Sequence, residues 1–331
     1  MLDHVAMANS IFRCLRGNNL YIFPILIDSM SRYISVRTQI ISLLIVTGIF
    51  LVGDKVFARI IDRAYDFSSM PDAMLYSGRG KADVVILGNS RAYHHFNDKD
   101  WSQELGLGVK TYAIEAASME YNEALLKDYI NIYGPPDVVV LELSCLTWDN
   151  GQVMNMRSLS LRSEHISKLL KEEYPKAYYI GKVLNLFNYN STSFLNVLHK
   201  IFVTYKQPIL SGQVDLGSVD KLISAEPKKY FLNKGHNLES LKNIQKMSQL
   251  NGFDLHLIVA PFMKELINSQ DGYEDWVKSL KEEYVNDAVI LDYGKRIIDN
   301  SYFKDLTHLN ESGVKELHKL LRDDGYFNSV K

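Results

Sequence analysis

Short, uninterrupted apolar runs alternate with helical patterns over most of the chain. Residues 83–91 read D-V-V-I-L-G-N-S-R, so four apolar residues lie between a charged residue and a glycine turn. Residues 137–143, D-V-V-V-L-E-L, open in the same way. Apolar runs without alternation are typical of strands that are buried on both faces of a parallel sheet. Further strands are expected at 109–114, 253–260 and 288–292.

Helical patterns fill the intervals between these runs. Ser118 and Asn310 stand where a helix N-cap is expected, each ahead of apolar residues that recur at helical spacing. Strands alternating with helices predict a three-layer α/β/α fold with a flavodoxin-like, doubly wound parallel sheet of about five strands. No G-x-G-x-x-G or P-loop motif follows the first strand, which argues against a nucleotide site. The expected helices cover 98–105, 118–132, 237–250, most of 263–283, and the residues after 310.

An uncharged apolar segment precedes this domain. Residues 38–53 contain no charged side chain, and apolar residues just before them can extend the run toward the roughly 17–25 residues of a spanning helix. A buried core helix or a cleaved signal peptide are the alternatives, but no A-x-A cleavage signal follows. We expect a transmembrane anchor at 38–55, a cytoplasmic segment at 1–37 and a connector at 56–81.

Two features of the chain's organisation stay open. Basic residues lie on both sides of the apolar segment, so its orientation is not fixed by charge. Met30 begins a compact basic leader, M-S-R-Y-I-S-V-R, so that Met1 and Met30 are both candidate starts. Within the expected α/β/α domain, 82–331, residues 144–235 do not follow the strand–helix alternation. They are read as an inserted cap.

Composition narrows the function classes. The chain has 331 residues and a formal net charge of −2, which argues against a nucleic-acid partner. Its two cysteines, Cys14 and Cys145, lie on opposite sides of the apolar segment and are not expected to pair. No clustered Cys/His pattern suggests a metal, and no cofactor is implied.

Candidate chemistry lies at the two ends of the domain. Ser90 follows the first strand, and Asp305 and His308 lie in D-L-T-H-L-N after the last strand. A serine becomes a nucleophile when a histidine takes its proton, and a carboxylate holds that histidine in the right tautomer. Ligands of doubly wound sheets bind at the carboxyl ends of the strands, where these loops are expected to meet. The alternative is that Asn89 or Ser90 only caps a helix.

Strand–G-N-S-R followed far downstream by D-L-T-H-L-N resembles the SGNH (GDSL-type) hydrolase superfamily. The resemblance is greatest to its membrane-anchored bacterial branch, which includes alginate acetylation proteins and the D-alanine transfer protein of teichoic acids. It covers roughly 83–321, although only the two end motifs are specific. The resemblance implies that Ser90 is the nucleophile, His308 the base and Asp305 its orienting partner. The backbone N–H of Ser90 would be one oxyanion donor.

The chain departs from this superfamily at the other oxyanion donors. No glycine follows the second strand, where the backbone N–H of Ala116 or Ala117 could donate instead. No asparagine follows the third strand, where the hydroxyl of Ser144 or, less directly, Asn150 could substitute. Losing one oxyanion donor typically slows a reaction by a factor of about 10²–10³. A substitute donor, a slow or transfer-specialised enzyme, and an inactive relative therefore all stay open.

Two charged residues near the motif have competing interpretations. Arg91 could bind an acidic substrate group or form a structural ion pair. Glu142 lies inside a buried strand and needs a partner, for which Arg91 is a candidate.

Other polar and aromatic residues are expected mainly in structural roles. His94 and His95 are adjacent and should point apart, solvated or half-packed. His256, inside an apolar strand, is expected to be a core histidine. Trp148 could form a sugar platform or pack beneath the cap.

The sequence thus predicts a membrane-anchored serine esterase or O-acyltransferase whose domain faces the periplasm or cell exterior. The expected substrate is an acetyl ester of a surface polysaccharide, and the acyl group would pass through Ser90 to water or a sugar hydroxyl. A membrane-bound acyl-donor protein is an expected further partner. One alternative is an inactive SGNH-fold component that binds polysaccharide or assembles an envelope complex. Another is a cytosolic lipase or thioesterase, which requires 38–53 to be a core helix.

Overall fold

The computed structural model describes residues 36–149, 151–190, 205–226, 229–233, 235–284 and 289–330. The chain forms two compact units, Met1–Phe57 and Ala58–Lys331. The two candidate starts, Met1 and Met30, and most of the expected cytoplasmic segment lie outside the described residues.

Helix α3 (Val36–Asp66) contains the apolar segment. Its part from Thr38 to Asp66 is long and apolar enough to cross a membrane, with a mean hydropathy of 2.1 in its most apolar window. The side chains of that window are almost entirely exposed, as with Leu43 at 66% and Ile49 at 69%. A core helix would bury them, so α3 has the properties of a membrane anchor or a signal sequence.

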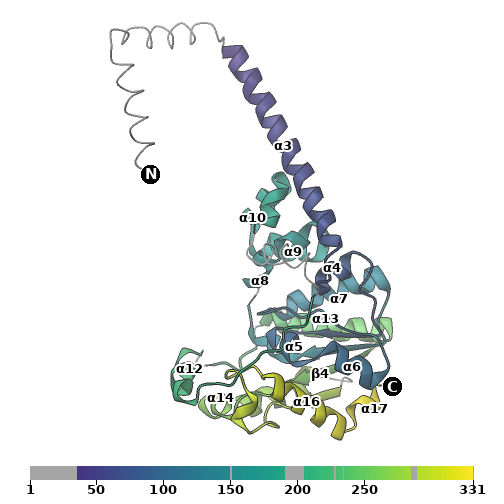
Figure 1. Cartoon of the computed structure of the whole chain (residues 1–331), viewed down its shortest axis with the longest axis vertical. Coiled ribbons are helices and arrows are strands. Elements are labelled where there is room, and N and C mark those ends of the chain that lie inside the picture. The colour runs from purple at the N-terminus through teal and green to yellow at the C-terminus, as the bar shows by residue number, and fades with distance from the viewer. Residues whose placement is uncertain are drawn as a thin grey trace, which may run out of the picture. The chain divides into compact units, whose positions relative to one another are not determined.

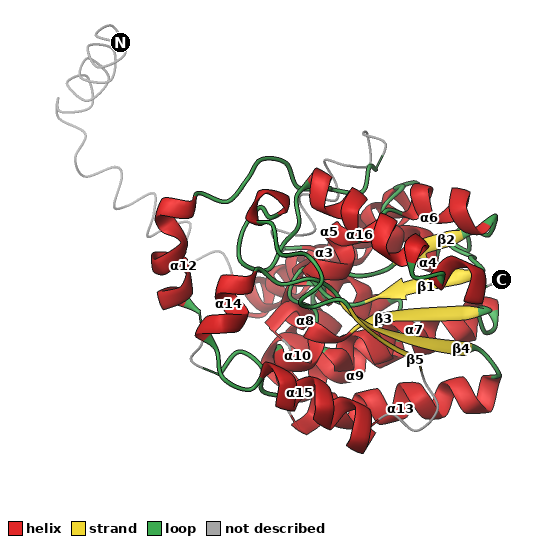
Figure 2. Ribbon diagram, turned by 90° about the horizontal axis from the view of Figure 1, so that it is seen from below, coloured by secondary structure: helices red, strands yellow, loops and turns green. Residues whose placement is uncertain are grey.

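The second unit is built on a five-stranded, fully parallel sheet of order β2-β1-β3-β4-β5. This is the flavodoxin-like order, so the predicted fold class is confirmed. Figure 2 shows α7 and α13 on one face of the sheet and α5, α6 and α16 on the other. The strands are β1 (Val84–Leu87), β2 (Val109–Thr111), β3 (Val138–Glu142), β4 (Asp254–Val259) and β5 (Val289–Asp292).

The central strands are buried because both faces are covered. Every residue of β1 and β3 is buried, in agreement with their unbroken apolar sequences. The covering helices are α4 (Pro71–Tyr76), α5 (Ser90–His95), α6 (Asp98–Leu105), α7 (Met119–Tyr133), α13 (Gly235–Asn251), α16 (Glu311–Asp323) and α17 (Tyr326–Ser329).

The helix expected over most of 263–283 is interrupted. Gly272 has a φ of 97° and precedes the second of two short helices, α14 (Lys264–Ser269) and α15 (Tyr273–Ser279). A right-handed helix cannot continue through a residue with this φ, which is readily adopted only by glycine. A π-helical turn, η5 (Leu280–Tyr284), continues α15.

The described part of the expected insertion contains short helices and no strand, and residues 205–215 and 229–233 are loop. Helix α9 packs on α7, and α10 packs on α9 (Figure 1). Within the same unit, Arg162 contacts the carboxylates of Asp62 and Asp66 at the end of α3, at 2.6 and 2.7 Å. The elements are η1 (Leu143–Thr147), α8 (Gly151–Asn155), η2 (Arg157–Leu161), α9 (Glu164–Glu173), α10 (Pro175–Val183), η3 (Asn185–Tyr189), η4 (Leu216–Ser218) and α12 (Val219–Ala225).

The stretch 56–81, expected as a connector, is largely helical and from Ala58 onward belongs to the compact second unit. Tyr65 near the end of α3 and Leu75 in α4 are both buried in its core. Their burial ties the end of α3 to the α/β/α unit.

Candidate active site

A glycine turn places Ser90 at the carboxyl edge of the sheet. Gly88 follows β1 with a φ of 148°, and a Cβ there would lie 2.7 Å from that of Ala92 and 2.9 Å from that of Glu142. Only glycine fits this approach. Asn89 then caps α5, since its Oδ1 accepts the N–H of Arg91 at 3.0 Å. Ser90 is the first residue of that helix.

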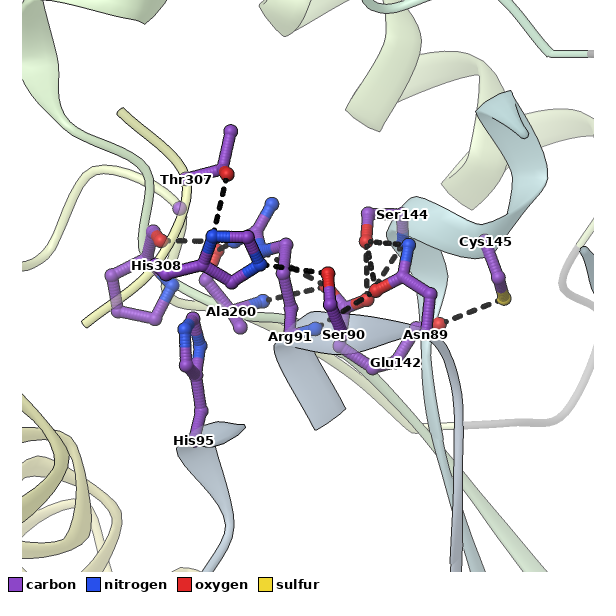
Figure 3. A network of polar contacts seen from close by, with 12 residues as sticks. Asn89, Ser90, Arg91, His95, Glu142, Ser144, Cys145, Ala260, Thr307 and His308 are labelled. Carbon is purple, nitrogen blue, oxygen red and sulfur yellow. Dashed lines mark hydrogen bonds and ion pairs between the residues drawn. The ribbon is translucent and has the colours of Figure 1, made fainter. Parts of the chain in front are cut away.

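Figure 3 shows Ser90 beside His308. Asp305 contacts the other side of the same imidazole. The Oγ of Ser90 lies 2.7 Å from Nε2 of His308, whose Nδ1 lies 2.9 Å from Oδ2 of Asp305. Asp305 is itself oriented by the backbone N–H groups of Thr307 and His308, which donate to its Oδ1 at 2.9 and 2.8 Å. The side chains therefore lie in the order hydroxyl, imidazole, carboxylate.

The ionisation of Asp305 fixes the direction of these hydrogen bonds. Burial alone would raise its pKa, but the hydrogen bond and charge of His308, with the two backbone N–H groups, outweigh burial and lower the pKa to about 2. An ionised Asp305 accepts the Nδ1–H of His308, and in the neutral tautomer that this bond favours Nε2 is the nitrogen that can accept the hydroxyl proton of Ser90. Proton transfer from Ser90 to His308 is then geometrically direct.

Ala116, which lines the same cavity as Ser90, has an unusual backbone conformation. Its φ is 53°, the only positive φ of a non-glycine among the described residues. Such a conformation costs on the order of 1–2 kcal/mol and often occurs at functional sites. Ala116 follows β2 and lines the same cavity as Ser90, at the position where a glycine donor was missing from the sequence.

That cavity has a volume of about 450 Å³. Ser90 and the 305–308 loop line one part of the cavity. The region after β3 lines another part with apolar and acidic side chains. Trp148 is 40% exposed there, which agrees with either of its expected roles. No sequence pattern marks the other wall residues, because the insertion carries no motif. These residues are Leu222, Glu226 and Tyr230.

A buried polar network lies behind the nucleophile. Glu142 is fully buried, and its Oε2 accepts both the N–H and the hydroxyl of Ser144. The Oγ of Ser144 in turn accepts an amide N–H of Asn89 at 2.8 Å. Ser144 is 1% exposed and is not among the residues that line the cavity. This corrects the expectation that its hydroxyl donates to an oxyanion, because the hydroxyl already donates a hydrogen bond to Glu142. The other candidate, Asn150, lies outside the described residues.

Of its two expected roles, Arg91 has the structural one, an ion pair with Glu142. It is 1% exposed, and its Nε lies 3.7 Å from Oε1 of Glu142. The guanidinium also donates to the carbonyls of Ala260 and Pro261 and stacks 3.3 Å from the ring centre of Phe262. With its charge directed into the protein, Arg91 is not placed to bind an acidic substrate, although it borders the cavity.

His94 and His95 are both buried, which corrects the expectation of solvated or half-packed side chains. Nε2 of His95 accepts the N–H of Leu309 at 2.9 Å, and burial lowers its pKa so that the ring is neutral. The ring centre of His94 lies 5.6 Å from that of His308, and its Nε2 lies 3.4 Å from a carboxylate oxygen of Glu115. The two rings flank the 305–308 loop. Nothing in the sequence could reveal this, because their partners are remote in the chain.

The remaining histidine and cysteine of interest lie in the core. His256 in β4 is buried and hydrogen-bonds the hydroxyl of Tyr326 at 3.0 Å, as expected of a core histidine. Cys145 is a buried free thiol. Among the residues that the structure describes, no group of three His, Cys, Asp or Glu side chains could hold a metal ion.

Comparisons with known proteins add little to this geometry. No protein-family model and no curated protein matches the chain. One similar solved structure is that of a candidate acylhydrolase from Bacteroides fragilis, at 10% identity and a TM-score of 0.33. The match covers 75% of this chain and 88% of the other. A likeness this distant carries no argument about the reaction. The reaction is therefore inferred from the geometry of the site alone.

Proposed function

We propose that this protein is a serine-dependent ester hydrolase or acyltransferase of the SGNH type. The observation that carries the proposal is the 2.7 Å contact between Ser90 Oγ and His308 Nε2, with Asp305 on the opposite nitrogen. In the proposed reaction His308 takes the hydroxyl proton while Ser90 attacks the ester carbonyl. The protonated His308 then gives the proton to the leaving alcohol, and an acyl-Ser90 intermediate remains.

The oxyanion of the tetrahedral intermediate needs donors close to Ser90. We assign this role to the backbone N–H groups of Ser90 and Ala116. Ser90 supplies an N–H from the first turn of α5, where such groups have no partner within the helix. The positive φ of Ala116, beside the same cavity, is the support for the second donor.

The second half of the reaction releases the acyl group to an acceptor. Water or a sugar hydroxyl gives its proton to His308 and attacks the acyl-Ser90 carbonyl. The bond between the acyl carbon and Oγ of Ser90 then breaks, and His308 returns the proton to Oγ. We propose an acetyl ester of a cell-surface polysaccharide as the substrate and a membrane-bound protein as a source of acyl groups. An open cavity with an exposed indole, Trp148, suits a sugar ring. The exposed apolar window of α3 supports membrane anchoring. That the second unit lies outside the cytoplasm is part of the proposal and follows from the proposed surface substrate.

Covalent labelling with a fluorophosphonate tests the proposal on the full chain in mild detergent. Wild type should be labelled, and Ser90→Ala and His308→Ala should not. Ser312→Ala, which removes an exposed serine at the start of α16, is the matched control and should label like wild type. A folded wild type that resists labelling would refute the catalytic proposal and favour an inactive component that binds polysaccharide.

A further inference from the structure

Helix α10 (Pro175–Val183) is apolar on the side that it turns away from the protein. Its inner face is closely packed, because Asn188 donates to the carbonyl of Gly181 at 3.0 Å and a Cβ on Gly181 would collide with the same side chain. Its outer face carries Tyr179, Ile180 and Val183, which are 59%, 44% and 59% exposed.

These three exposed side chains form one continuous stripe. Positions 179, 180 and 183 follow the i, i+1, i+4 spacing of a single helix face. A helix that packs apolar residues on one side and exposes them on the other does not have the solvated face of an ordinary surface helix. Lys176 and Lys182, both exposed, lie beside the stripe and supply positive charge.

The position of α10 within the second unit indicates that a lipid surface covers the exposed stripe. Arg162, just before α9, holds Asp62 of α3 at 2.6 Å, and Tyr189, in the element after α10, donates to the same carboxylate at 3.0 Å. The chain on both sides of α10 is therefore tied to the end of the helix that carries the apolar window. Asp62 follows the end of the uncharged run 38–53 by nine positions of the same helix.

We infer that α10 lies in the membrane interface, with the Tyr179–Ile180–Val183 stripe among the outer acyl carbons. Lys176 and Lys182 would extend to lipid phosphates, as the long stems of lysines allow. Tyrosine is suited to this depth because its ring is apolar and its hydroxyl is polar. This inference rests on the anchoring part of the proposed function and is independent of the reaction at Ser90. It gives the second unit two membrane attachments, the anchor and α10, which would limit its rotation above the lipid.

Fluorescence quenching in liposomes tests the inference on the full chain. Cys14 is replaced by serine, and buried Cys145 is left because it has no accessible surface for labelling. Val183→Cys is labelled with the polarity-sensitive dye NBD in vesicles of phosphatidylcholine and phosphatidylglycerol. We expect a blue-shifted emission that nitroxide lipids quench, more strongly with the nitroxide near the headgroup than near the acyl end. Lys319→Cys on α16 is the control and should not be quenched, since α10 and α16 lie at opposite ends of the second unit (Figure 1).

The outcomes distinguish a lipid surface from a second copy of this chain as the partner of the stripe. A chain that stays in the vesicles after an alkaline wash but shows no quenching at position 183 overturns the α10 inference alone. Strong energy transfer between donor- and acceptor-labelled chains, without lipid quenching, would instead assign the stripe to a second copy of this chain. A chain that the wash removes overturns both the anchoring and this inference, and leaves the fluorophosphonate result at Ser90 unaffected. Ile180→Glu, added to the labelled chain, should weaken the quenching while its thermal unfolding stays close to that of the parent.

Discussion

The hydroxyl of Ser90 lies 2.7 Å from Nε2 of His308, although 218 residues separate them along the chain. Strands β3 and β4 stand between β1 and β5 in the sheet, so the chain after β5 must cross two strands to reach Ser90. Two contacts hold it in place: Met263, after β4, donates its N–H to the carbonyl of Leu306 at 3.0 Å, and Leu309 donates to His95. The contact is thus built by the fold and not by local sequence.

Replacing Asp305 by asparagine should reduce turnover far more than binding. The asparagine amide can donate to Nδ1 of His308, which favours the tautomer whose Nε2 carries a proton and cannot accept one from Ser90. A comparable change in serine proteases lowers kcat by about 10⁴. We expect a loss on the order of 10²–10⁴ in kcat for Asp305→Asn, measured with p-nitrophenyl acetate, with KM within a few-fold of wild type. A kcat for Asp305→Asn close to that of wild type would contradict a specific role for the carboxylate.

Asp305 should also make stability depend on pH in strongly acidic solution. Its pKa is lowered to about 2 in the folded protein from an ordinary value of 3.8. Between these values the unfolded chain binds more protons than the folded one, so the free energy of unfolding falls as the pH is lowered through this window. Urea unfolding at several pH values between about 4 and 2 should show a shallower decline for Asp305→Asn than for wild type. Parallel declines would mean that Asp305 is not selectively stabilised as a carboxylate.

The sheet was predictable because each strand is marked by the residues of that strand alone. The unbroken apolar runs that became β1 and β3 can be accommodated only by strands covered on both faces. Ser118 and Asn310 were predictable as caps for the same reason, and both accept the expected backbone N–H groups of α7 and α16. The interruption at Gly272 was missed because a lone glycine in an apolar pattern is also tolerated within a helix.

The site was predictable only in part. Ser90, Asp305 and His308 stand in short motifs beside strand ends, so their meeting could be expected from the topology. The burial of His94 and His95 could not, since it depends on Glu115 and Leu309, which no pattern connects to them. Nor could the sequence show that the Ser144 hydroxyl donates a hydrogen bond to Glu142 and is therefore unavailable to an oxyanion.

The buried pair of Arg91 and Glu142 should be more sensitive to removal of one partner than of both. Each side chain is at most 1% exposed, and single replacement leaves the other charge without its counter-ion. Breaking a buried pair this way typically costs about 3–5 kcal/mol, whereas an uncharged pair of similar size can be nearly neutral. We expect Arg91→Met and Glu142→Gln each to lower the urea midpoint markedly, and the double variant to recover part of the loss. Additive losses in this cycle would show that the two charges do not stabilise each other.

Ala116 offers a test of the second oxyanion donor that separates backbone shape from side-chain chemistry. Its φ of 53° is natural for glycine, so Ala116→Gly should keep the turn and change the free energy of unfolding by no more than about 1 kcal/mol. Ala116→Val should force the turn out of this conformation, because a β-branched residue rarely adopts it. If the turn aims an N–H at the oxyanion, kcat for p-nitrophenyl acetate should fall by about 10²–10³ in the valine variant and stay near wild type in the glycine variant. A valine variant that remains folded by circular dichroism and fully active would remove Ala116 from the proposed mechanism and leave Ser90 as the only assigned donor.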